Sequence, residues 1–170
     1  MALSMYEISI PMFINNFNIL SNILRKAEKD AEKRKIEKSV FMNARLAPDM
    51  LPLTKQIQIG TDMVRLGIGR LADIKAPSFK DNEVTFSDLQ KRIKKTITFL
   101  EKIKSKQMDG SELKKIELSI GKRKLVFKFK NGYMYLSNWI IPHFFFHMTT
   151  AYDILRLNGV SLGKRDFVKM

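Results

Sequence analysis

Residues 132–157, GYMYLSNWIIPHFFFHMTTAYDILRL, decide the fold because their inward positions repeat with the period of an α-helix. The stripe consists of Leu136, Ile140, His143, His147, Ala151 and Ile154. Asn158-Gly159 follows the segment, as is typical of a helix end. Both histidines of the chain lie on this stripe four residues apart, so their imidazoles should project from one face of the helix.

Three earlier segments show the same amphipathic period, which predicts helices over residues 4–33, 49–72 and 85–106. Capping-box spacing supports two of the starts, with Ser4 before Glu7 and Thr85 before Asp88. Pro11 either bends the first helix or marks where its regular hydrogen bonding begins. Residues 115–129 instead alternate apolar and polar side chains around a Gly-Lys-Arg-Lys turn, which indicates a β-hairpin.

These patterns predict a mainly all-α protein, an antiparallel four-helix bundle with a small β-hairpin inserted between its third and fourth helices. The chain has 170 residues, 45% of them hydrophobic, so we expect one domain over residues 1–170. No cysteine is present, which excludes disulfides and thiol catalysis by the chain itself. No apolar run approaches membrane-spanning length, so we expect a soluble cytoplasmic protein.

The formal net charge of +14 would attract nucleic acids, acidic proteins or an anionic surface. Solvated helix faces explain most of the lysines and arginines. The most concentrated candidate patch is the hairpin turn 121–124, flanked by Lys114, Lys115, Lys128 and Lys130. Nucleic-acid binding therefore stays open as a rival function.

A polar pocket is expected between the second and fourth helices. Pro142 cannot donate its amide, so it should bend the fourth helix beside His143. Gln56 falls on the inward stripe of the second helix, and Asp49 lies two helical turns before it. The predicted lining is Asp49, Gln56, His143 and His147, with Arg45 and Tyr6 as neighbours. Arg45 either binds a carboxylate or phosphate of a ligand or pairs with Asp49.

Two interpretations of the histidines remain open. His147 could be a core histidine that is hydrogen-bonded to Gln56 or Asp49. Alternatively, His143, His147 and Gln56 could bind a divalent metal, although catalytic zinc sites normally use three good protein ligands. No Gly-x-Ser-x-Gly motif is present, so serine catalysis has no support.

Several segments resemble an uncharacterised branch of the DinB-like (YfiT-like) superfamily, which is defined by a domain of unknown function. They include Asn43-Ala44-Arg45-Leu46-Ala47-Pro48-Asp49-Met50, Phe146-His147-x-Thr149-Thr150-Ala151-Tyr152 and the end of the chain from Asn158 to Phe167. The resemblance spans nearly the whole chain and implies a four-helix bundle.

The resemblance also implies possible activities. Relatives hold a divalent metal, often nickel or zinc, with one histidine on the second helix and a His-x-x-x-His pair on the fourth. His143 and His147 match the pair, whereas Gln56 stands near the second-helix position. Some relatives are transferases or isomerases that use a low-molecular-weight thiol. The open functions are therefore small-molecule binding, or a transferase, isomerase or hydrolase that depends on nickel, zinc or manganese; a homodimer is also possible.

Overall fold

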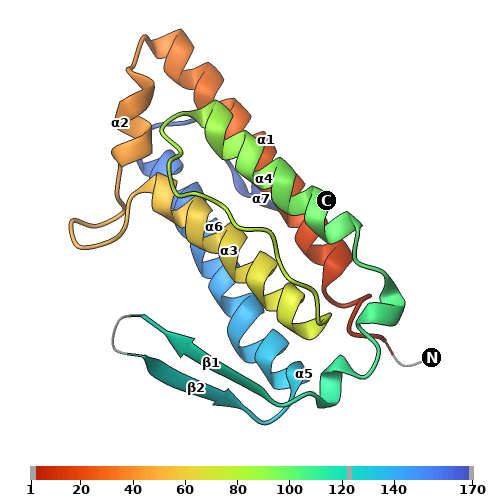
Figure 1. Ribbon diagram of the computed structural model, residues 1–170. Coiled ribbons are helices and arrows are strands. Elements are labelled where there is room, and N and C mark those ends of the chain that lie inside the picture. Colours follow the sequence, from red (N-terminus) through yellow and green to blue (C-terminus); the bar gives the residue numbers. More distant parts are fainter. Residues whose placement is uncertain (1–2, 122–123, 169–170) are drawn as a thin grey trace.

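Figure 1 shows the computed structural model, which describes residues 3–121 and 124–168. Four long helices form a bundle: α1 (Ile10–Arg34), α3 (Leu53–Leu71), α4 (Phe86–Glu101) and α6 (Ile141–Leu157). α1 packs against α4, and α3 packs against both α4 and α6. The apolar stripes of these helices meet in one core, which confirms the predicted mainly helical bundle.

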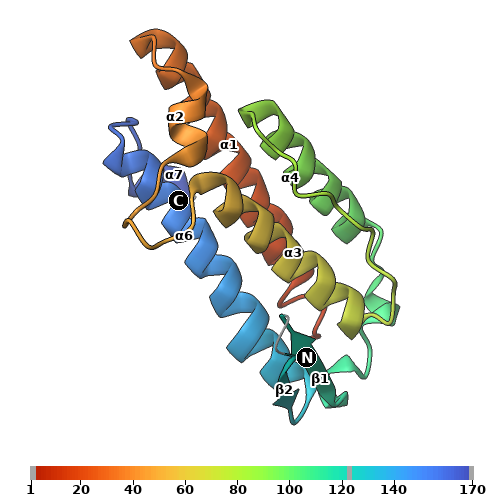
Figure 2. The ribbon, with the colours of Figure 1, turned by 60° about the vertical axis from the view of Figure 1, so that its left-hand side comes forward.

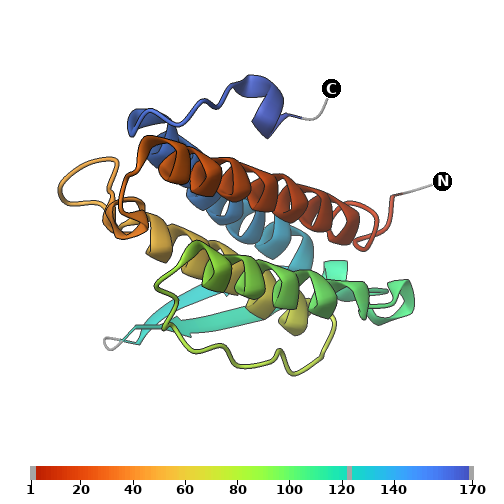
Figure 3. The ribbon, with the colours of Figure 1, turned by 90° about the horizontal axis from the view of Figure 1, so that it is seen from above.

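The directions of the helices explain the long connection between α3 and α4. α1 and α6 run one way, while α3 and α4 both run the other way (Figures 1 and 2). Because α3 and α4 share a direction, residues 72–85 must return along the length of the bundle. Figure 3 shows this return segment (residues 72–85) on the outside of α3 and α4.

α1 begins later than the predicted range of 4–33. Ser4 and Glu7 do form a capping box, with the Ser4 amide 2.9 Å from Glu7 Oε2 and the Glu7 amide 3.2 Å from Ser4 Oγ. It caps a turn, and the α-helix starts at Ile10 with Pro11 in its first turn, where the missing amide costs no hydrogen bond. Of its two predicted roles, Pro11 therefore marks the start of the regular helix.

α3 also begins later than its predicted start at residue 49. The short helix α2 (Lys38–Asn43) is followed by a loop over residues 44–52, and Pro52 stands at the cap of α3. A residue before proline is disfavoured in helical conformation, so Pro48 and Pro52 keep this stretch out of the helix. The predicted helix 85–106 is correct at its start but ends at Glu101, before the 3₁₀ turns at Ser105–Gln107 and Ser111–Leu113.

The predicted hairpin is confirmed as β1 (Ile116–Ile120) paired antiparallel with β2 (Leu125–Phe129). Its turn residues 122 and 123 lie outside the described ranges. On β2, the rings of Phe127 and Phe129 lie 4.7 and 5.6 Å from the ring of Trp139, centroid to centroid. These contacts attach the hairpin to the segment that leads into α6.

The predicted fourth helix, 132–157, consists of three consecutive parts: α5 (Gly132–Tyr135), a π-helical turn (Leu136–Ile140) and α6. The wide turn stands just before Pro142, which cannot donate to a helical carbonyl. The π-helical turn thus stands where a bend was predicted, and His143 lies in the first turn of the α6 helix that follows it. Beyond α6, the short helix α7 (Lys164–Phe167) packs on α1.

Candidate functional site

Gln56 and His147 form the centre of the candidate site. His147 Nδ1 lies 2.7 Å from Gln56 Oε1, and Gln56 Nε2 donates to the Leu51 carbonyl at 2.8 Å. Gly60 allows α6 to come this close, because a methyl group there would lie 3.3 Å from His147 Cβ. Since the amide oxygen of Gln56 can only accept, His147 carries its proton on Nδ1 and presents an unprotonated Nε2.

The surroundings keep His147 neutral. Its side chain is buried, and this burial, followed by a smaller Coulombic contribution from His143, lowers the pKa of His147 to about 4. Among the described residues, only Gln58 Oε1 and Arg65 Nε are fully buried side-chain polar atoms without a partner. His147 Nε2 has no hydrogen-bond partner in the described ranges and therefore reaches the surface. At neutral pH it is a hydrogen-bond acceptor open to a ligand.

His143, one turn earlier on α6, is half-buried. Its Nδ1 lies 2.8 Å from the Trp139 carbonyl, and the two rings lie 4.2 Å apart, centroid to centroid. The carbonyl accepts, so Nδ1 of His143 also carries a proton. Both histidines thus donate from Nδ1 to an oxygen acceptor.

The other predicted pocket residues lie elsewhere. Arg45 Nη1 donates to the Met50 carbonyl, and Asp49 is exposed on the loop 44–52. The structure shows no ion pair between Arg45 and Asp49, so the predicted pairing is wrong, because residues 45–49 do not form the helical turn that would bring the two side chains together. Leu51, which accepts from Gln56, nevertheless places this loop beside the site. The segment with Tyr6 precedes α1 at the end of the bundle near α5, whereas α3, with Gln56 in its first turn, begins at the other end (Figure 1).

The donor set for a metal is smaller than the one expected from relatives. Among the described residues, no group of three or more histidine, aspartate or glutamate side chains could hold a metal ion. Gln56 is not a free ligand, since its oxygen binds His147 and its nitrogen binds the Leu51 carbonyl. The structure therefore assigns Gln56 to orienting His147, and two imidazoles remain as donors.

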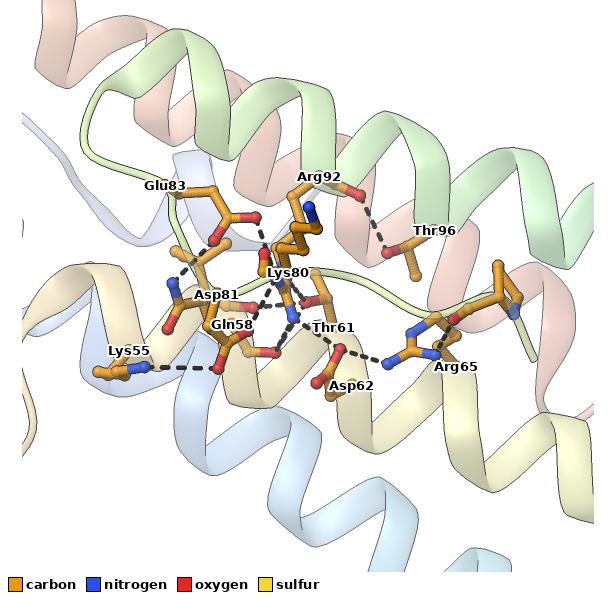
Figure 4. Close-up of polar contacts among 12 residues, drawn as sticks. Lys55, Gln58, Thr61, Asp62, Arg65, Lys80, Asp81, Glu83, Arg92 and Thr96 are labelled. Atoms are coloured by element: carbon orange, nitrogen blue, oxygen red, sulfur yellow. Dashed lines mark hydrogen bonds and ion pairs between the residues drawn. The ribbon is translucent and has the colours of Figure 1, made fainter.

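A second polar cluster, which the sequence did not predict, lies between α3, α4 and the return segment (Figure 4). Its centre is the buried Arg92 of α4. The guanidinium pairs with Asp62 at 2.7 Å, Glu83 at 2.9 Å and Asp81 at 3.1 Å. Arg92 Nε also donates to Thr61 Oγ1 at 2.7 Å. These contacts attach the return segment to both helices.

Arg65 extends this cluster along α3. It pairs with Asp62 at 2.8 Å and donates to the Pro77 carbonyl. The ring of Phe79 in the return segment contacts both arginines, with its centroid 4.5 Å from Arg65 Cζ and 5.3 Å from Arg92 Cζ. Arg65 and Arg92 are both buried, although neither lies on the inward stripe that the apolar period predicts for its helix.

The predicted basic patch at the hairpin has less unbalanced positive charge than expected, because two of its lysines have acidic partners. Lys114 pairs with Asp73, and Lys128 lies 3.4 Å from Glu117. Lys122 and Arg123 fall outside the described residues. Within the described ranges, no helix combines the length and apolar character needed to cross a membrane.

Comparisons with known proteins identify the family. The chain matches the family described as a domain of unknown function (DUF1993) over residues 5–168. It is similar to the crystal structure of a DinB family member protein from Shewanella denitrificans, with 34% identity, a TM-score of 0.88, and coverage of 97% of this chain and 92% of that chain. No curated protein matches it. The chain belongs to the DUF1993 family, an uncharacterised family with a DinB-like bundle.

Proposed function

We propose that this protein binds a small molecule through the neutral imidazole of His147, on the face that α3 and α6 share. The observation that carries the proposal is the fixed tautomer. Gln56 Oε1 holds the Nδ1 proton at 2.7 Å, and Nε2 is left without a partner among the described residues. Two side chains from different helices thus present one acceptor atom in one orientation.

A purely structural histidine would be expected to use both ring nitrogens. Since Nε2 of His147 reaches the surface, water can donate to it in the free protein. A ligand hydroxyl, amide or thiol group could donate to Nε2 in place of that water. Because the pKa of His147 is about 4, the acceptor is available throughout the neutral range. A low-molecular-weight thiol is one ligand of this class, and the exposed Arg45 and Asp49 on the adjacent loop are candidates to contact it.

Histidine side-chain NMR tests this proposal directly. Protein labelled with ¹⁵N-histidine is titrated with phenol, a short amide and a small thiol in the presence of a chelator. We expect the Nε2 resonance of His147 to move with at least one of these probes. Gln56→Met, which removes the acceptor but keeps the length of the side chain, should weaken that binding by about tenfold through loss of the tautomer. The proposal fails if His147→Phe binds the same probes as well as the wild type does.

A second candidate function, a weak divalent metal site, rests on a different observation. Both histidines donate Nδ1–H to an oxygen acceptor, Gln56 Oε1 for His147 and the Trp139 carbonyl for His143. Metal-bound histidines normally make this bond, which leaves Nε2 for the metal. The two imidazoles would hold the ion, and nitrogen donors suit nickel and zinc better than manganese. A bound ion would supply Lewis-acid chemistry to a ligand in its open positions.

Metal content distinguishes the two candidates. Protein purified without a histidine tag is titrated with zinc chloride and nickel chloride by calorimetry. If the site holds metal, His143→Ala and His147→Ala should each abolish binding, because either variant leaves a single imidazole. Probe binding that persists in chelator, with no metal uptake, supports the small-molecule proposal alone.

A further inference from the structure

A groove runs between the return segment and α4, on the opposite side of α3 from His147. Its volume is about 710 Å³, within the range of roughly 300–1,000 Å³ that is typical of small-molecule sites. Five lysines line it: Lys75 from the return segment and Lys91, Lys94, Lys95 and Lys102 from α4. We call this feature the lysine groove.

The charge of the lysine groove is not balanced locally. None of the residues that line it is acidic. Of the five groove lysines, only Lys91 has a carboxylate of a described residue within 4 Å, that of Asp88 at 3.7 Å. In contrast, Lys114 and Lys128 near the hairpin both have acidic partners. Like charges gathered around a concave surface raise the local concentration of anions.

The same groove has apolar walls in fixed positions. Phe99 of α4 is buried to 9% exposure, and Phe79 of the return segment is half-buried. The contacts of Phe79 with Arg65 and Arg92 hold its ring in place, and the ion pairs of Arg92 hold the return segment. The walls are therefore organised before any ligand arrives, which lowers the entropic cost of binding.

We propose that the lysine groove binds an amphipathic small anion, with one carboxylate, sulfonate or phosphate group on an aromatic or acyl body. The lysines would hold the acidic group, and Phe79 and Phe99 would contact the body. This site is independent of the proposed ligand site at His147. A nucleic acid fits less well, because base stacking needs a fully exposed aromatic face, whereas Phe99 is buried and Phe79 is only partly exposed, with Arg65 over one face.

A matched pair of fluorescent dyes tests the proposal. 8-Anilino-1-naphthalenesulfonate carries an apolar ring system and one sulfonate, and N-phenyl-1-naphthylamine has the same rings without the charge. We expect the folded protein to bind the sulfonate dye at a single site, with an affinity that falls as salt is added. The neutral dye should bind much more weakly. Equal binding of the two dyes would overturn the assignment to an anion.

Charge-matched variants locate the site. Lys91→Gln/Lys95→Gln removes two groove lysines, and Lys33→Gln/Lys130→Gln removes two exposed lysines elsewhere. The groove variant should bind the sulfonate dye about fivefold more weakly than the control variant. Thr98→Trp, at an exposed position that lines the groove, keeps every charge and should reduce binding by filling the space. Equal affinity in the two lysine variants, or no effect of Thr98→Trp, would overturn the proposal.

Discussion

Replacing Arg92 with methionine is the most severe single test of how α3, α4 and the return segment are held together. The Arg92 side chain is 1% exposed and lies between the carboxylates of Asp62, Asp81 and Glu83. Methionine keeps much of the length of the side chain but cannot donate a hydrogen bond. Arg92→Met therefore leaves three carboxylates close together without their shared cation.

The exposed fractions of these carboxylates set the size of the effect. Removing one partner of a buried ion pair costs about 3–5 kcal/mol. The Glu83 side chain is 9% exposed and cannot regain water easily, whereas Asp62 and Asp81, at 30% and 47%, can be hydrated. We therefore expect a loss of about 3–4 kcal/mol in the free energy of unfolding. For a chain of this size the melting temperature should fall by about 10 °C.

Urea denaturation followed by circular dichroism measures the loss, with Arg156→Met as the control. Arg156 is exposed and has no ion pair in the described ranges, so its replacement should change stability by less than about 0.5 kcal/mol. The double variant Arg92→Met/Glu83→Gln should recover part of the loss, because the least hydrated carboxylate becomes neutral. If Arg92→Met lowers the free energy of unfolding by no more than Arg156→Met does, the ion pairs of Arg92 contribute nothing to stability and the reasoning is refuted.

Lowering the pH from 7 to 5 should reduce the free energy of unfolding by about 2 kcal/mol, because His147 keeps a pKa of about 4 when folded while the unfolded chain takes up a proton near 6.5. Urea titrations at both pH values check this, and His147→Phe should lose the difference. Thr85→Ala removes the side chain that caps α4 and should cost about 1 kcal/mol, whereas Ser87→Ala, two residues later and exposed, should be nearly neutral in the same assay. Gly132→Ala should lower the melting temperature by more than about 5 °C in calorimetry, since the added methyl carbon would lie 1.9 Å from the Ser111 carbonyl oxygen; an unchanged value would contradict this packing.

The helices and the hairpin could be predicted because their signals are local. The apolar period of each long helix marks the side that faces the core, and the alternation over residues 115–129 marks a pair of strands. Helix ends were less well predicted. α1 and α3 start later than predicted, with Pro11 in the first turn of α1 and Pro52 at the cap of α3.

Only the part of the candidate site that lies on helices could be predicted from the sequence. The pairing of Gln56 with His147 follows from two inward stripes on adjacent helices. Arg45 and Asp49 were placed by assuming that α3 extends upstream, and the loop does not follow helical geometry. The Arg92 cluster could not be derived in this way, since its carboxylates include Asp81 and Glu83 from a segment without periodicity.

The ion pairs of Arg92 also bear on the order in which the chain folds. The partners of its guanidinium group lie between Gln58 and Glu83, so none is more than 34 residues away along the sequence. By contrast, α1 and α6 come from opposite halves of the chain, and their contact closes a much longer loop. Loop-closure entropy is smaller for the nearer contacts. The segment 53–101 can therefore assemble early as a local unit, on which α1 and α6 complete the core.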